Sequence, residues 1–271
     1  SPGTSGRIRD LLHANGVKAS VGFAPERIAQ GKALHELRAL PQIISAFDER
    51  GLQVQRDIFG AVAHGKLIEL KPMEAELAKL FSNTYRYINF AISNQFFAIA
   101  ERAGADFNAI HHAVTHEYPR MSAFAKAGFA AGPCLFKDTM QLAAFSQNTF
   151  FLGHAAMLIN EGFPAVTVDM LEARLHHSVQ GEKVGILGMT FKKDNDDTRD
   201  SLAFKLRKLL EAKGADVICH DPFLQAADFP DLRLAPLEEV RRRPSVIIGA
   251  PHSAYQGLQA ANGQIVIDIW S

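Results

Sequence analysis

The sequence predicts an α/β fold in which two strand-and-helix segments flank a long helical segment. Residues 1–70 and 181–271 alternate short apolar runs with amphipathic helices, a pattern typical of parallel sheets covered by helices. Between them, apolar residues from Met73 to Gly104 recur at three- and four-residue steps, as on a helix. The length of 271 residues exceeds that of a typical single domain. We therefore expect domains at residues 1–70, 71–180 and 181–271.

The composition narrows the functional class. Hydrophobic residues make up 47% and charged residues 21%, which is typical of a soluble globular protein. The 29 basic and 29 acidic residues cancel, so no basic face for nucleic acid is expected. No apolar run approaches a membrane span, and no signal peptide precedes the first helix. The two cysteines, Cys134 and Cys219, lie far apart and indicate a reducing, cytoplasmic setting.

The first segment reads as the end of an α/β domain. An amphipathic helix around Ile8 stops at Asn15-Gly16, and Asp48 is placed to cap a later helix. Three short apolar runs are expected to be strands: Val17–Gly22, Gln42–Ser45 and Lys66–Leu70.

The second and third segments differ in kind. The helix from Met73 is followed by further helix, by a cysteine loop and by another helix from about Thr149 to Leu171. A long helix with so broad an apolar surface predicts a symmetric partner, and hence a homodimer. The third segment is expected to be a doubly wound α/β domain with a helix at Ser201–Lys213 and four strands, at Lys183–Met189, Asp216–His220, Ser245–Gly249 and Ile265–Ile269.

The stretch from Gly128 to Asp138 carries the clearest chemical signal. It reads Gly-Phe-Ala-Ala-Gly-Pro-Cys-Leu-Phe-Lys-Asp. Small residues around Cys134 let a ligand approach the backbone, and the ammonium of Lys137 would favour the nucleophilic thiolate. A lone cysteine is more often a buried structural residue. The flanking residues favour a nucleophile at Cys134.

This stretch resembles the catalytic-cysteine loop of the nucleotide-sugar 6-dehydrogenases, the UDP-glucose/GDP-mannose dehydrogenase family. That loop usually reads Gly-Phe-Gly-Gly-Ser-Cys-Phe-Pro-Lys-Asp; here Cys-x-x-Lys-Asp is intact, while Ala130, Ala131, Pro133 and one extra residue depart from it. The resemblance extends over nearly the whole chain. It implies NAD-dependent oxidation of a nucleotide-diphosphate sugar at C6, from alcohol to carboxylate, through a thiohemiacetal and a thioester on Cys134. A UDP-sugar is favoured, with UDP-glucose, UDP-N-acetylhexosamines and GDP-mannose left open.

The resemblance also assigns roles to residues outside the loop. Lys79 and Asn83 share one face of the long helix, and in the family this pair stabilises the oxyanions of the covalent intermediates. Glu26, in Ala-Pro-Glu-Arg, would assist water attack on the thioester. Many members carry a second acid four residues later, where this chain has Gln30. Asp138 would orient a water near Lys79. Without the resemblance, Lys79 and Asn83 would be interpreted as a solvated polar face and Glu26 as an ordinary loop glutamate. Asp138 would be interpreted as an acid at a helix N-terminus that interacts with the helix dipole.

A second signature follows the strand that begins at Lys183. The stretch Phe191–Ser201 resembles the family's Phe-Lys-x-x-x-x-Asp-x-Arg-x-Ser. In the family, Phe191 and Lys192 would contact the nucleotide-sugar. Arg199, with Lys137, would reach the NAD pyrophosphate, for which the planar guanidinium fork is suited. Arg120, in a loop before the cysteine, would reach the neighbouring subunit's substrate. An ordinary solvated loop is the alternative for both arginines.

Histidines and the C-terminus add two expectations. No histidine has zinc spacing with a cysteine or an acid, so no metal is predicted; the clustered ones are His111, His112, His116, His176 and His177. Near the C-terminus, Asp268-Ile269-Trp270-Ser271 stands where UDP-glucose enzymes often have Asp-Gly-Arg.

The opening Ser-Pro-Gly-Thr-Ser resembles a segment that follows about the fourth strand of an N-terminal Rossmann domain. The chain contains no Gly-x-Gly, so the dinucleotide fingerprint is absent and residues 1–70 are expected to be the C-terminal part of the NAD-binding domain. Two alternatives remain. The chain would be a non-catalytic nucleotide-sugar-binding and dimerisation fragment, or a cysteine hydrolase, for which no histidine motif near Cys134 is found.

Overall fold

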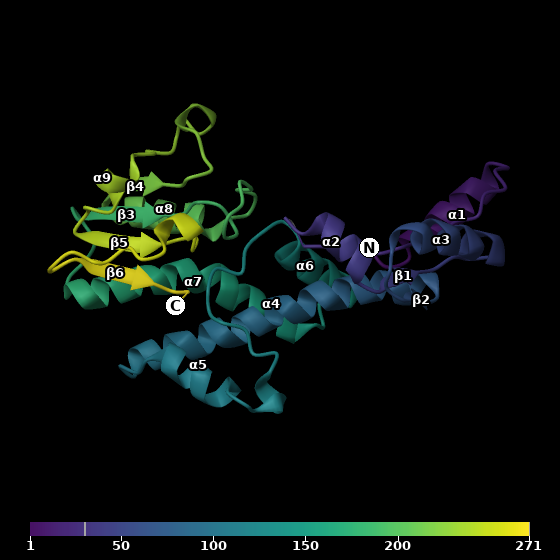
Figure 1. Cartoon of the computed structure of the whole chain (residues 1–271), viewed down its shortest axis with the longest axis horizontal. Coiled ribbons are helices and arrows are strands. Elements are labelled where there is room, and N and C mark those ends of the chain that lie inside the picture. Colours follow the sequence, from purple (N-terminus) through teal and green to yellow (C-terminus); the bar gives the residue numbers. More distant parts are fainter. Residues whose placement is uncertain (30, 271) are drawn as a thin grey trace. The chain divides into compact units, whose positions relative to one another are not determined.

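The structure, a computed structural model, describes residues 1–29 and 31–270 (Figure 1). The chain divides into two compact units, and we describe each by itself. The first comprises Ser1–Tyr85 with Asp138–Phe151, and the second Arg86–Lys137 with Leu152–Ser271. Gln30 and Ser271, which the sequence comparison singled out, lie outside the described residues.

The first unit contains a small parallel sheet. Strands β1 (Gln42–Ile44) and β2 (Leu67–Glu69) pair in parallel, and α3 (Glu49–Val62) packs on both. The carboxylate of Asp48 accepts the Gly51 N–H at 2.7 Å and caps α3, as the sequence predicts. Two shorter helices complete this part, α1 (Thr4–Ala14) and α2 (Ala33–Ala39).

The prediction of a strand at Val17–Gly22 is wrong. The segment makes a single antiparallel bridge, from Gly22 to Ala46. Its main-chain bonds are few: Phe47 N–H donates to the Val21 carbonyl at 3.0 Å, and Phe23 N–H donates to the Ser45 carbonyl at 2.8 Å. The segment therefore meets the chain just after β1 and does not run beside it, so no ladder of bonds forms.

The predicted long helix is confirmed as α4 (Pro72–Arg102), which begins in the first unit and ends in the second. Its Glu76 accepts the Ser5 N–H at 2.8 Å and the Ser5 hydroxyl at 2.6 Å, which satisfies one main-chain donor in the first turn of α1. The other helices of the central part are α5 (Phe107–Thr115), the 3₁₀ turn η1 (Pro119–Met121), α6 (Leu135–Phe145) and α7 (Phe151–Leu175).

The second unit contains the doubly wound sheet that the sequence predicts. Its parallel strands lie in the order β4-β3-β5-β6, side by side in Figure 1, with bounds β3 Lys183–Leu187, β4 Asp216–His220, β5 Ser245–Ile248 and β6 Ile265–Asp268. The chain leaves β3 through α8 (Leu202–Ala212) for β4, then passes through α9 (Leu237–Val240) to β5 on the other side. The strand order thus reverses at β3, which brings the carboxyl ends of β3, β4 and β5 to one edge.

The core of the second unit joins this sheet to the helices. Ile186, Ile247 and Ile267 on three neighbouring strands are completely buried, as are Leu206 and Leu210 on α8. No helix in the described part of the chain combines the length and apolar character needed to cross a bilayer.

β3 ends at Leu187, two residues before the predicted end, because Gly188 turns out of the sheet with φ +90°.

Gly188 provides a test of this turn. A Cβ on Gly188 would lie 2.5 Å from backbone atoms of Ala250, whereas a Cβ on Gly181, with φ +79°, would meet nothing within 4 Å. Gly181→Ala should therefore cost about 1 kcal/mol through backbone strain alone, and Gly188→Ala about 1–3 kcal/mol more through the clash. Urea unfolding of both variants measures the difference. Equal losses would show that Gly188 is not confined by Ala250.

Candidate active site

The cysteine loop, residues 128–134, is fastened at its first residue by a buried polar chain. The Gly128 N–H donates to Asn94 Oδ1 of α4 at 2.9 Å. The Asn94 amide donates to Asn160 Oδ1 of α7 at 3.0 Å, and the Asn160 amide donates to the Tyr87 carbonyl at 2.9 Å. Both asparagines are completely buried. Since an unpaired buried amide is costly, this chain fixes the start of the loop against two helices.

Aromatic rings hold the same end of the loop. Phe129 lies edge-on to Phe163 and to Trp270, with ring centroids 6.1 and 6.2 Å apart. Gly128 has φ +148°, and a Cβ there would lie 2.4 Å from the Trp270 ring. The Trp270 indole donates to the Ile248 carbonyl at 3.1 Å, which orients the ring. Trp270 thus occupies the space beside the loop.

The other end of the loop, at Gly132, lies against Phe191, the first residue of the second signature. Gly132 has φ +98°, and a Cβ there would lie 2.8 Å from the Phe191 ring. Cys134 is exposed and directly precedes α6. Arg199 has its pKa raised by hydrogen bonds to Asp197 and by the charge of that carboxylate, with a smaller contribution from Cys134. The structure therefore brings Cys134, Phe191 and Arg199 into one neighbourhood.

Four of the five predicted catalytic residues form two pairs within the first unit. Lys79 Nζ donates to the Glu26 carbonyl and lies 3.5 Å from Glu26 Oε2. One turn along α4, the Asn83 amide donates to Asp138 Oδ2 at 2.6 Å, and both side chains are buried. The sequence placed Lys79 and Asn83 on one helix face, and here each meets one of the two predicted acids. Cys134, the fifth residue, belongs to the second unit.

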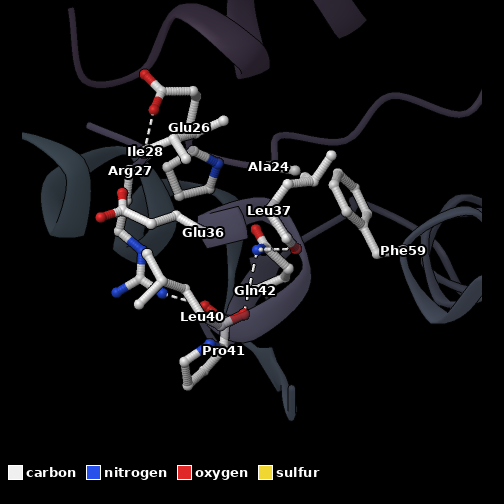
Figure 2. A pocket seen from close by; sticks show the side chains of 11 residues that line it. Ala24, Glu26, Arg27, Ile28, Glu36, Leu37, Leu40, Pro41, Gln42 and Phe59 are labelled. Carbon is white, nitrogen blue, oxygen red and sulfur yellow. Dashed lines mark hydrogen bonds between the residues drawn. The ribbon is translucent and has the colours of Figure 1, made fainter. Parts of the chain in front are cut away.

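The loop that carries Glu26 lies over a cavity of about 120 Å³ (Figure 2). The Glu36 carboxylate on α2 accepts the Ala29 N–H at 2.6 Å, and the Arg27 guanidinium donates to the Pro41 carbonyl. The Gln42 amide donates to the Leu37 and Leu40 carbonyls at 3.1 Å each, bonds that are drawn as dashed lines in Figure 2. Bonds to Glu36 of α2 and to the Pro41 carbonyl therefore anchor Ala29 and Arg27, which follow Glu26 in the same loop.

The remaining predicted residues lie in the second unit. The Arg120 guanidinium lies 5.5 Å from the centre of the Tyr118 ring and donates to its hydroxyl at 3.4 Å. Lys192 accepts the Thr190 hydroxyl at its carbonyl, at 3.2 Å, and Lys137 lies in the first turn of α6. In the described residues no three His, Cys, Asp or Glu side chains gather to hold a metal ion.

Sequence reasoning missed Asn94, Asn160 and Trp270. Asn94 interrupts the apolar face of α4, which is a weak signal for a buried polar contact. Asn160 lies in the otherwise apolar α7 and carries the same signal. Trp270 was noted only as a departure from a family pattern, and its contact with Gly128 spans more than half the chain.

The two thiols differ sharply in environment, which predicts their labelling. Cys134 is exposed, whereas burial raises the pKa of the Cys219 thiol to about 12. A disulfide reagent at pH 8 should therefore label one thiol per folded chain and two in denaturant. Cys134→Ala should label none when folded. Labelling of Cys219 at a comparable rate in the folded chain would contradict the burial of β4.

Comparison with known proteins now identifies the family. Residues 73–161 match the central domain of the UDP-glucose/GDP-mannose dehydrogenase family, and residues 185–271 match the UDP binding domain of that family. Among curated relatives, UDP-N-acetyl-D-mannosamine dehydrogenase of Methanocaldococcus jannaschii is 30% identical over 94% of this chain and 58% of the relative. UDP-glucose 6-dehydrogenase of Rickettsia bellii is 25% identical over 82% of this chain and 52% of the relative.

Solved structures agree in fold. A UDP-glucose dehydrogenase from Pyrobaculum islandicum matches all of this chain and 65% of its own, with a TM-score of 0.90 and 30% identity. A UDP-D-ManNAc dehydrogenase from Pyrococcus horikoshii gives a TM-score of 0.88 and 25% identity over 66% of its chain. The chain thus spans less than two thirds of these relatives. Two domains matched in order, and a fold shared along the whole chain, show that it belongs to the UDP-glucose/GDP-mannose dehydrogenase family.

Proposed function

We propose that this chain supplies the nucleotide-sugar site and the cysteine nucleophile of an enzyme that oxidises a nucleotide-diphosphate sugar at C6, from alcohol to carboxylate. The observation that carries the proposal is the exposed Cys134, directly before α6, in a loop whose Gly128 N–H is bonded to Asn94 and whose Gly132 lies against the Phe191 ring. A UDP-sugar is favoured, because residues 185–271 match a UDP binding domain and the relatives described above are named for UDP-sugars. A cytoplasmic location fits such a substrate.

The residues of the chain suit the steps after the first oxidation. An aldehyde cannot lose hydride until a nucleophile adds to it, and the Cys134 sulfur provides that addition. The Lys79 ammonium and the Asn83 amide are donors of the kind that stabilise an oxyanion. Glu26 and Asp138, which contact them, would handle the water and its proton when the thioester is hydrolysed. Arg120 and Lys192 would bind the diphosphate.

The reaction removes two hydrides and therefore requires an acceptor, for which the family uses NAD. The described residues fit this cofactor only in part. The first unit has two parallel strands, and the sequence has no glycine-rich loop to cradle a pyrophosphate. Arg199 and Lys137 are the cationic residues proposed to reach it. We therefore expect this chain alone to bind the nucleotide-sugar and to bind NAD poorly.

A second candidate is a binding and dimerisation module without catalysis. The absence of the glycine-rich loop from the sequence favours it. Turnover by the 271-residue chain would exclude it. Sugar-nucleotide binding without turnover would be common to both candidates, so turnover after addition of the part of a relative that this chain does not span decides between them.

The homodimer expected from α4 is also a proposal. Large apolar side chains are exposed along this helix at steps typical of a helix-packing seam: Phe81, Tyr85, Ile92, Phe96 and Ile99. A surface of this kind on a long helix suits a second copy of the same helix, since a two-fold axis makes the contact self-complementary.

Ligand binding is predicted to separate sugar nucleotides from NAD. UDP at one hundred times its dissociation constant should stabilise the chain by about 2.7 kcal/mol and raise its melting temperature. NAD at the same concentration should not. Lys192→Ala should weaken UDP about tenfold or more, because it removes a charge-assisted contact, while Lys193→Ala, its exposed neighbour, should bind as wild type. NAD reduction by this chain with any sugar nucleotide would overturn the expected division.

The dimer and its shared site are tested by substitution and mixing. Phe96→Glu should convert a dimer to a monomer in light scattering, whereas Leu34→Glu, on exposed α2, should not. In the whole enzyme, inactive Arg120→Ala and inactive Cys134→Ala subunits should regain activity when mixed. No recovery despite demonstrated subunit exchange would count against a role for Arg120 across the interface.

A further inference from the structure

The carboxyl ends of three neighbouring strands carry a buried polar group that the proposed reaction does not use. Asp221 follows β4, His252 follows β5 by a short turn, and Thr190 follows β3. The side chains of Asp221 and His252 are completely buried, and His252 Nε2 lies 3.1 Å from Asp221 Oδ2. A buried acid-and-histidine pair at the edge where such sheets bind ligands calls for an explanation.

The bonds around the pair fix the histidine tautomer. His252 Nδ1 accepts the Asp194 N–H at 2.9 Å, and a main-chain N–H can only donate. The ring proton therefore lies on Nε2, which faces Asp221 Oδ2 and the Thr190 hydroxyl at 3.0 Å. Asp221 Oδ2 also accepts the N–H groups of Met189, at 2.7 Å, and Thr190, at 3.1 Å. With both nitrogens engaged and no exposure, His252 is held as a structural link.

The charge on Asp221 is stabilised by the same bonds. Burial by itself raises the pKa of this carboxyl, but hydrogen bonds from His252 and from the Met189 and Phe223 N–H groups outweigh it and leave the pKa below its ordinary value. Asp221 thus acts as a carboxylate acceptor for groups that come from three strand ends.

The loop of residues 189–197 is the segment that these bonds hold. Besides the bond to His252, Asp194 accepts the Ser253 N–H at 2.8 Å and the Ser253 hydroxyl at 2.6 Å. Within the loop, Phe191 N–H donates to the Asp197 carbonyl at 3.0 Å. Phe191 then reaches out of the loop to cover Gly132, two residues before the cysteine.

We propose that Asp221 and His252 are positioning residues, which hold the loop 189–197 so that Phe191 packs on Gly132 beside Cys134 and Lys192 is presented to the nucleotide diphosphate. The statement about Lys192 rests on the proposed function; the statement about the cysteine loop does not. The effect of Asp221 and His252 on the cysteine loop is proposed to pass through Phe191, which packs on Gly132.

The test uses two substitutions and one matched control. His252→Phe removes both ring nitrogens. His252→Asn keeps an acceptor near Nδ1 for the Asp194 N–H but loses the bond to Asp221. Tyr255→Phe is the control, because it keeps the ring that lies edge-on to His252, with centroids 5.5 Å apart, and removes only a hydroxyl that donates to the His220 carbonyl at 2.9 Å.

Amide hydrogen exchange and calorimetry with UDP are the measurements. In His252→Phe, exchange should accelerate about tenfold in residues 189–197 and also in the cysteine loop, with partial rescue in His252→Asn. UDP should bind about tenfold more weakly to His252→Phe. Tyr255→Phe should lower the melting temperature but leave exchange in both loops and UDP binding unchanged.

The outcomes separate the two proposals. If wild type fails to bind UDP, the proposed function is wrong, and hydrogen exchange still decides the positioning role. If His252→Phe does not fold, acceleration in both loops of His252→Asn supports the role, and its absence overturns it. Faster exchange in residues 189–197 alone, with the cysteine loop unchanged, would overturn the link through Phe191.

Discussion

The site depends first on the buried contact between Asn94 and Asn160. Two amides in an apolar helix interface are tolerated only because each finds a partner, and one partner is the Gly128 N–H of the cysteine loop. This arrangement ties three separate segments, α4, α7 and the loop, to one geometry. A hydrophobic pair in the same place would pack as well but would leave Gly128 without an acceptor. The loop would then be held by its aromatic contacts alone.

The same unit shows how a sheet of four short strands can support a site at its edge. The strands carry mainly apolar side chains, and the polar side chains that position the site lie in the turns that follow them. Those turns are held by one another: Asp221 and His252 link the ends of β3, β4 and β5, and Trp270 after β6 reaches the cysteine loop. Each turn is therefore positioned by residues distant in sequence.

Local pattern was enough to predict the regular elements and the pairing of residues on one helix. The three- and four-residue steps of α4 placed Lys79 and Asn83 on one face, and the cap at Asp48 was read from sequence alone. Pattern failed at Val17–Gly22, where an apolar run lacks a neighbouring strand to pair with. The sequence pattern also failed to indicate Asn94, Asn160 and His252. The contribution of a buried polar group to stability depends on its hydrogen-bond partners, which only the tertiary fold supplies.

The two ends of the cysteine loop have a consequence for how this sequence can vary. Ala130 and Ala131 replace glycines of the resembled loop without adopting positive φ, so glycine is not required there. Gly128 and Gly132 are different, because a ring lies where a side chain would be: Trp270 at one end and Phe191 at the other. Each glycine and its ring share one volume, so a larger residue at either glycine is compatible with folding only if the opposing ring becomes smaller. Substitutions are therefore expected to occur in pairs, at Gly132 with Phe191 and at Gly128 with Trp270. The members of these pairs lie 59 and 142 residues apart in the sequence.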